Sequence, residues 1–262
     1  MKQFIQSILG KFGYRITKIR EHKEYPNIDI LDLVIGDYLK RLDEEFYFIQ
    51  IGAHDGKWCD PINNYVKRFH WNGLLVEPQP RAFQKLVENY SDQPQLKFEN
   101  ALIFNENRAE VPLYTVHNEG DNDALFQLSY MARLDRDSLF RELSSFGLEE
   151  VNSLIEEIRV PSLTIPNLLE KHDFPKLDLL VIDAEGYDFE ILKMFDFSKI
   201  KPAIIQLEIA HLSIDEKNEC FSYLAQNGYR ISTVVFDAIG YLQVGGELEN
   251  PGLGIVELLG RL

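Results

Sequence analysis

Short apolar runs alternate with segments of helical spacing over most of the chain. The runs are the length of buried strands, and they lie at 46–51, 73–77, 96–103, 179–182 and 203–207. The segments between and after them predict helices near 59–69, 80–90, 165–172 and 215–227. This alternation predicts an α/β fold, in which helices cover both faces of a mostly parallel sheet.

The stretch from 104 to 160 interrupts this order. Val111–Val116 predicts an extra strand, and the charged stretch from Arg133 to Ile158 has helical spacing. Long insertions at the carboxyl side of a sheet often carry function. We therefore expect a lid or a substrate wall here, with a surface elaboration that has no chemistry as the alternative.

The two ends of the chain follow other patterns. Residues 31–42 predict an amphipathic helix, so that 1–45 would form a helical extension and 46–262 the main domain. A chain of 262 residues is long enough for one α/β domain with a sizeable core. Beyond residue 228, apolar runs predict antiparallel strands at 229–235, 241–244 and 254–259.

Two glycines enclose the turn after the first predicted strand, where residues 50–56 read QIGAHDG. A glycine directly after a strand permits positive φ and a close approach to a ligand. The second strand ends on Glu77, and an acid at that place in an open α/β sheet can bind both hydroxyls of a ribose. The two features together predict a cofactor that contains a nucleoside.

The residues of the turn indicate what kind of nucleoside cofactor is expected. A dinucleotide fold carries Gly-x-Gly-x-x-Gly, whose middle glycine makes room for a pyrophosphate. Here His54 and Asp55 fill the turn, and we expect Asp55 to place negative charge where phosphates would lie. A cofactor without phosphate is therefore favoured, and S-adenosylmethionine (SAM) has a ribose and a cationic sulfonium.

Four motifs in order resemble the FkbM-type SAM-dependent methyltransferases: residues 50–56, 73–78, 180–188 and 204–213, within a match from about 46 to 235. The resemblance implies a Rossmann-like class I methyltransferase sheet and methyl transfer to a hydroxyl of a small molecule or a glycan sugar. The residues expected to bind the cofactor are Gln50, Gly52, Ala53, His54, Asp55, Gly56, Glu77, Pro78, Asn100, Ala101, Asp183 and Glu185.

Some of these assignments have alternatives. Gln50 replaces the acid usual in the wider methyltransferase pattern, and its amide can still accept a hydrogen bond from the cofactor. Asn100 and Ala101 lie where an adenine edge is expected, and a structural role in a turn is equally open for Asn100. Glu185 either orients the cofactor or caps the following helix.

Catalysis is expected to depend on Asp183, Glu208 and His211. Asp183 ends the fourth core strand, and the other two follow the fifth strand at the same edge of the sheet. An imidazole has an unperturbed pKa near 6.5, suited to a general base, and Glu208 could orient it. Asp183, Glu185 and Glu208 could also hold a hard cation, but this spacing is too common to predict a metal.

The net charge and its distribution along the chain indicate which partners and which location to expect. The net charge of −15 argues against a nucleic-acid partner. Residues 1–23 carry six basic side chains against one acid and have an apolar helical face, so they suit either a membrane surface, or the acidic body of the protein or of a second subunit. With two cysteines and no apolar span, we expect a cytoplasmic protein, with the inner face of the membrane as an alternative site.

Two other functions compete with methyl transfer. One is an NAD- or nucleotide-dependent enzyme that modifies sugars on the same type of sheet, against which the missing middle glycine counts. The other is a module that binds SAM or S-adenosylhomocysteine (SAH) without turnover, which the replacement by Gln50 favours.

Overall fold

Seven strands form the main sheet of the computed structural model, which describes residues 29–58, 60–117, 128, 131–148 and 150–242. Their order is β3-β2-β1-β7-β8-β10-β9; the first five are parallel, and β10 runs antiparallel to both its neighbours. The predicted fold class is confirmed. The strands are β1 (Tyr47–Ile51), β2 (Asn72–Val76), β3 (Leu96–Glu99), β7 (Leu179–Ile182), β8 (Ile204–Glu208), β9 (Tyr229–Val234) and β10 (Asp237–Leu242).

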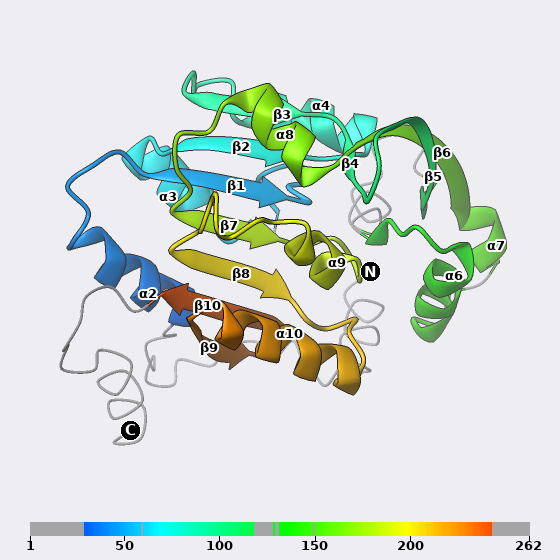
Figure 1. Cartoon of the computed structure of the whole chain (residues 1–262). Helices are drawn as coiled ribbons and strands as arrows, with labels where there is room; N and C mark the ends of the chain where they lie inside the picture. Colours follow the sequence, from blue (N-terminus) through cyan, green and yellow to red (C-terminus); the bar gives the residue numbers. More distant parts are fainter. Residues whose placement is uncertain (1–28, 59, 118–127, 129–130, 149, 243–262) are drawn as a thin grey trace, which may run out of the picture.

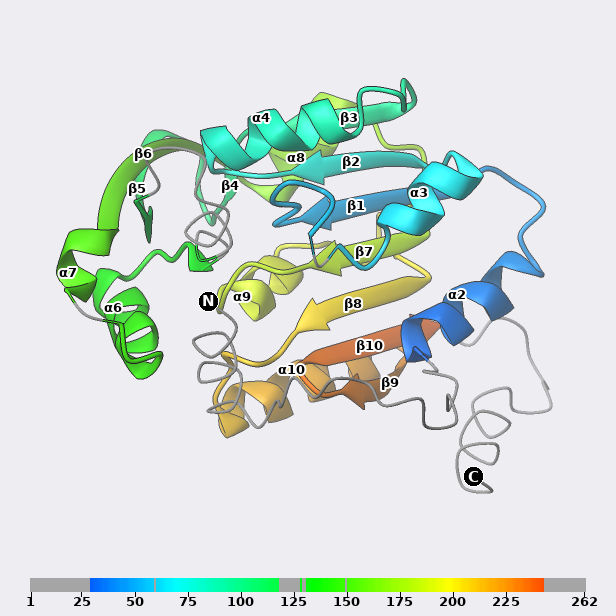
Figure 2. The ribbon, with the colours of Figure 1, turned by 180° about the vertical axis from the view of Figure 1, so that it is seen from behind.

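Helices cover both faces of this sheet (Figures 1 and 2). One face carries α2 (Ile30–Leu39), α3 (Asn63–Phe69) and α4 (Pro80–Asn89). The other carries α8 (Ile165–His172), α9 (Asp188–Lys193) and α10 (Ile214–Gln226). Among the described residues, no helix combines the length and the apolar character that a membrane span requires.

Two hydrophobic cores lie on the two faces because successive strand residues point to opposite sides. Phe48 packs under α2–α4, whereas its neighbour Ile49 packs under α8–α10, and both are fully buried. At the amino end of the sheet, the buried carboxylate of Asp178 accepts hydrogen bonds from the Tyr47 N–H (2.8 Å) and the Tyr38 hydroxyl (2.6 Å). This carboxylate ties α2 to the first strand.

The interrupted stretch forms a smaller sheet at the carboxyl ends of the parallel strands (Figure 1). Its order is β4-β6-β5, and two helices and a small core accompany it. The elements are β4 (Leu102–Ile103), β5 (Arg108–Val116), α6 (Arg136–Ser145), α7 (Val151–Leu154) and β6 (Ile155–Leu163).

Three boundaries predicted from the sequence were wrong. The run 96–103 is not one strand, because the chain leaves the main sheet after Glu99 and β4 pairs with β6 instead. The helical spacing assigned up to Ile158 ends earlier, since β6 begins at Ile155 and pairs along β5. The last described strand is 237–242 rather than 241–244. The predictions for 1–23 and 254–259 lie outside the described residues.

Gly52 is required where β1 ends, and we expect Gly52→Ala to destabilise the protein. The residue has φ of +82°, and an added Cβ would lie 1.7 Å from the carbonyl oxygen of Asp183. A backbone oxygen cannot yield as a flexible side chain does, so the expected loss is at least about 3 kcal/mol in the free energy of unfolding. Urea or thermal unfolding measures it, at about 2–4 °C per kcal/mol for a chain of this size.

Gly36→Ala is the matched control. Gly36 lies within α2, and an added Cβ would meet nothing within 4 Å. Alanine is the better helix former there, so this variant should gain about 0.5–1 kcal/mol. Equal stability of the two variants would contradict the close approach at Gly52.

Candidate functional site

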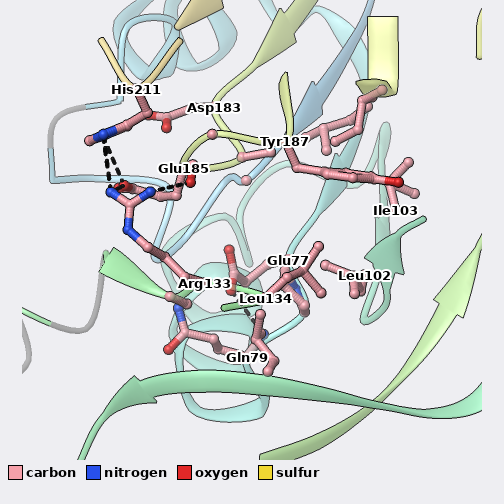
Figure 3. Close-up of a pocket in the computed structure, with 18 of the residues that line it drawn as sticks. Glu77, Gln79, Leu102, Ile103, Arg133, Leu134, Asp183, Glu185, Tyr187 and His211 are labelled. Carbon is pink, nitrogen blue, oxygen red and sulfur yellow. Dashed lines mark hydrogen bonds and ion pairs between the residues drawn. The ribbon is translucent and has the colours of Figure 1, made fainter. Parts of the chain in front are cut away.

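A cavity of about 540 Å³ opens where β1, β2 and β7 end (Figure 3). Its opposite wall comes from β4, β5 and α6 of the smaller sheet and its helices. Eight of the residues expected to function line it: Gly52, His54, Glu77, Pro78, Ala101, Asp183, Glu185 and His211. Six others do not: Gln50, Ala53, Asp55, Gly56, Asn100 and Glu208.

The loop after β1 is fixed by backbone hydrogen bonds to the end of β2. The N–H groups of Gly52 and Ala53 both donate to the carbonyl of Val76, at 2.9 and 3.0 Å. His54 then adopts positive φ (45°), and its N–H donates to Glu77 Oε2 at 2.8 Å. The loop is thus shaped before any ligand arrives.

From the sequence we expected Asp55 to place its negative charge in the cavity. In the structure, Asp55 does not line the cavity. Its carboxylate accepts the N–H groups of Lys57 (3.0 Å) and Trp58 (2.9 Å) within its own loop. Burial alone would raise the pKa of Asp55, but hydrogen bonds from His54 and those two backbone groups lower it to about 2. Asp55 therefore stabilises the turn.

Glu77 is buried at the edge of the cavity, with 3% of its surface exposed. Besides the bond from His54, its Oε1 accepts the N–H of Gln79 at 2.9 Å. Desolvation raises the pKa of Glu77, and these hydrogen bonds and the nearby His54 offset part of that rise. The Gln79 side chain also hydrogen-bonds to Glu77, so at least one of the roughly four lone-pair sites of the carboxylate remains for a ligand.

The segment after β3 contributes an apolar wall. Ala101, Leu102 and Ile103 line the cavity. Asn100 instead donates its amide to the carbonyl oxygens of Glu77 (2.7 Å) and Pro78 (3.1 Å). These two hydrogen bonds support a structural role in a turn for Asn100.

Gln50 lies on the side of β1 away from the cavity lining. Its side chain hydrogen-bonds to Asp60, and its Oε1 is buried without a hydrogen-bond partner among the described residues.

The turn after β7 carries three acids. Asp188 is 1% exposed and accepts the N–H groups of Ala184 and Gly186, both at 2.8 Å. Asp183 lines the cavity and is exposed to it. Desolvation first, and then the neighbouring carboxylates of Glu185 and Asp188, raise the pKa of Asp183 well above its usual range.

Glu208 lies behind Asp183 and outside the cavity lining. Its Oε2 is buried without a hydrogen-bond partner in the described part of the chain, and its Oε1 is 3.7 Å from His211 Nε2. Desolvation, reinforced by the charge of Asp183, raises the pKa of Glu208 to about 10.

Arg133 is the main site residue that sequence reasoning missed. It lies in the insertion and is 7% exposed. Its guanidinium donates to Glu142 of α6 and to the carbonyl and carboxylate of Glu185, and Nη2 lies 3.1–3.2 Å from both ring nitrogens of His211 (Figure 3). Its only sequence signal was its place in a stretch expected to form a substrate wall.

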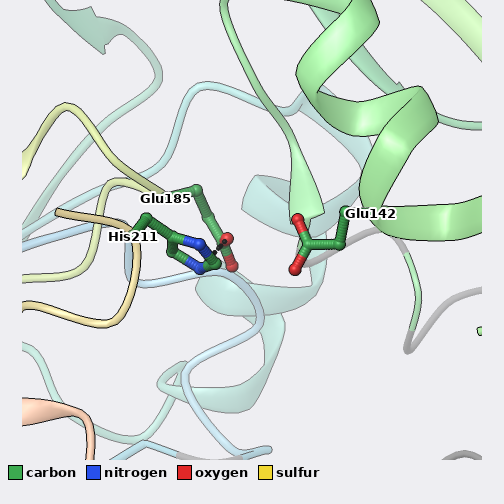
Figure 4. A group of neighbouring side chains, drawn as sticks. All are labelled: Glu142, Glu185 and His211. Atoms are coloured by element: carbon green, nitrogen blue, oxygen red, sulfur yellow. Dashed lines mark ion pairs between the residues drawn. The ribbon is translucent and has the colours of Figure 1, made fainter. Parts of the chain in front are cut away.

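Within the described part of the chain, two groups of side chains bring possible metal-ligand atoms within 4.8 Å of one another. The first consists of Glu142, Glu185 and His211 (Figure 4). Both of its carboxylates pair with the Arg133 guanidinium, which already supplies a positive charge. The second consists of Asp183, Asp188 and Glu208. Acidic groups are common without an ion, and we assign a metal to neither.

Some solved methyltransferases are similar to this chain. "Methyltransferase FkbM" from Methylobacillus flagellatus is 12% identical over 75% of this chain and 43% of that one, with a TM-score of 0.43. Precorrin-6y C5,15-methyltransferase from Geobacter metallireducens is 12% identical over 85% of this chain and 95% of that one, with a TM-score of 0.40. Ribosomal protein L11 methylase from Lactobacillus delbrueckii is 9% identical over 88% and 91%, with a TM-score of 0.37.

This chain thus spans less than half the length of the first of these structures. No curated protein matches the sequence. The family model described as "Methyltransferase FkbM domain" matches residues 50–231. That range contains every residue of the cavity described above and more than half of the chain. The chain belongs to the FkbM methyltransferase family.

Proposed function

We propose that this protein is a SAM-dependent O-methyltransferase that acts on a hydroxyl of a small molecule or a glycan sugar. Membership in the methyltransferase family supports the reaction class. The observation that carries the cofactor assignment is Glu77, a buried carboxylate at the end of β2 whose two oxygens are oriented by backbone N–H groups. A carboxylate so placed suits the two hydroxyls of a ribose.

The chemistry of the cavity fits SAM. Glu77 would hold the ribose, the wall of Ala101–Ile103 would face the adenine, and Asp183 would face the cationic end. The cationic side chains in the lining, Arg133 and Arg141, come from the insertion rather than from the sheet edge. The sheet edge thus offers acids and apolar groups, which favour a cation over a diphosphate. When bound, SAM supplies an activated methyl group.

The insertion supplies the polar side of the cavity. Ser138, Arg141 and Glu142 line it from one face of α6, whereas Leu139 and Leu143 of the same helix are buried in the small core. Hydroxyl, guanidinium and carboxylate groups suit an acceptor that has hydroxyls. Residues 104–160 therefore serve, in this proposal, as the acceptor wall.

Methyl transfer to an alcohol requires a group that takes the hydroxyl proton. Asp183 and His211 both line the cavity and are the two candidates. Glu208 would act through them, since it lies behind the lining. Asp183 and Glu208 bring oxygens within 4.8 Å, and like charges that close favour a pair that shares one proton.

Three expectations from the sequence stay proposals: membrane contact through residues 1–23, a cytoplasmic location and a homo-oligomer. Co-sedimentation with anionic vesicles, compared between the full chain and a chain that begins at Glu24, tests the first. Equal binding of the two chains would remove it.

We expect SAH to bind with micromolar affinity and Glu77→Ala to weaken that binding ten-fold or more, or about 1.4 kcal/mol. The reason is the loss of the acceptor for the ribose hydroxyls. Isothermal titration measures the affinity. Glu99→Ala is the control, because Glu99 ends the neighbouring strand and pairs with Lys171 and His172. Absence of SAH binding to the wild type, or binding of NAD in its place, would contradict the proposal.

We expect Glu208→Gln to become more stable relative to wild type as pH rises from about 5 to 9. The pKa of Glu208 is raised to about 10 in the folded protein, so its stabilising contribution is complete below the unfolded pKa and is lost as pH rises toward the folded one. The difference should grow by up to about 1.4 kcal/mol per pH unit.

Urea unfolding over that pH range measures the difference. Glu190→Gln, on the exposed side of α9, is the control and should leave the pH dependence unchanged. A constant difference between Glu208→Gln and wild type would show that Glu208 is ionised in the folded protein.

A further inference from the structure

The side chain of Gln79 lies beside Glu77 in the lining of the cavity (Figure 3). Gln79 is the N-cap residue of α4, yet its side chain caps none of the N–H groups of that helix, which the structure describes in full. The residue is 8% exposed, so both ends of its amide need protein partners. One partner is Glu77, whose carboxyl group hydrogen-bonds to the side chain of Gln79 as well as to its backbone N–H.

The other partner of the Gln79 amide is Thr115 of β5, in the insertion. The Thr115 hydroxyl donates to Gln79 Oε1 at 2.7 Å, and Thr115 is 3% exposed. Residues two apart on a strand point to the same side, and Leu113 lines the cavity, whereas Thr115 lies outside the lining. A β-branched side chain is stiff at χ1, so β5 fixes where the hydroxyl lies.

These two partners favour one orientation of the amide. Both oxygens of Glu77 accept backbone N–H groups, from His54 and from Gln79, so the carboxyl group acts as an acceptor. An amide has donors on its nitrogen and lone pairs on its oxygen. With its NH₂ group toward Glu77, the amide presents Oε1 to the hydroxyl of Thr115. The reversed amide would set its oxygen against the carboxylate.

We propose that Thr115 is a positioning residue of the cofactor site, which acts through the Gln79 amide to hold the Glu77 carboxylate in place for the ribose hydroxyls. This role rests on the proposed function, in which Glu77 binds the ribose. Without the hydroxyl of Thr115, Gln79 Oε1 loses its donor in a buried place, and the amide is no longer held toward Glu77. The insertion thereby contributes to cofactor affinity through a residue outside the cavity lining.

Isothermal titration of the full-length protein with SAH tests this role. Thr115→Val keeps the branched shape and the strand preference of the side chain and removes the hydroxyl. We expect its dissociation constant for SAH to rise about three- to ten-fold, the range for one oriented hydrogen bond. Thr115→Ser keeps the donor, so it should retain the affinity that Thr115→Val loses. Thr233→Val, the same change at an exposed position of β9, is the matched control.

A double-mutant cycle tests whether Thr115 acts through Gln79. Gln79→Met keeps the length of the side chain and removes the hydrogen bonds of the amide. In that background, Thr115→Val should weaken SAH binding no further. Equal losses in both backgrounds would overturn the proposal, because they would assign the effect to packing, and so would wild-type affinity in Thr115→Val or in Gln79→Met. Where Thr115→Val does not fold, Thr115→Ala takes its place in the same cycle.

The same titrations separate this role from the proposed function. SAH binding that Glu77→Ala weakens and Thr115→Val leaves unchanged would overturn the role of Thr115 and retain the function. Absence of SAH binding to the wild type would overturn the proposed function, and the role of Thr115 with it.

Discussion

The cavity depends on how closely the chain after β1 passes the chain after β7. A glycine at 52 lets two backbone segments approach to a distance that no side chain would allow, and the adjoining N–H groups then reach the end of β2. Three strand ends are thereby fixed relative to one another by backbone atoms. Glu77, Asp183 and the loop of His54 inherit their positions from this contact.

The elements of the fold and the site residues that depend on local sequence pattern could be predicted from the sequence. Buried strands and helical stripes predicted the alternating elements of a mostly parallel sheet, and an acid directly after a strand end, such as Glu77 or Asp183, must emerge at the carboxyl edge. The turn glycines could also be identified from local pattern, because a position directly after a strand that requires positive φ is usually occupied by glycine.

Pattern failed where specific hydrogen bonds or the pairing of distant segments, rather than periodicity, decide how a residue is placed. The direction of Asp55 is decided by N–H groups of its own loop, and that of Asn100 by two carbonyls of the preceding strand end. The run 96–103 is continuous in hydrophobicity, although its two halves belong to different sheets. Arg133 has no local signal, because only the fold brings it to Glu185 and His211.

The short strand β4 has a consequence for the affinities of the site. Leu102 and Ile103 form the apolar wall of the cavity and pair with β6, which carries the insertion. Any acceptor that shifts the insertion must also shift the surface against which, in the proposed function, the cofactor would pack. Such coupling is reciprocal: an acceptor that strengthens cofactor binding by some factor is itself bound more tightly, by the same factor, when the cofactor is present.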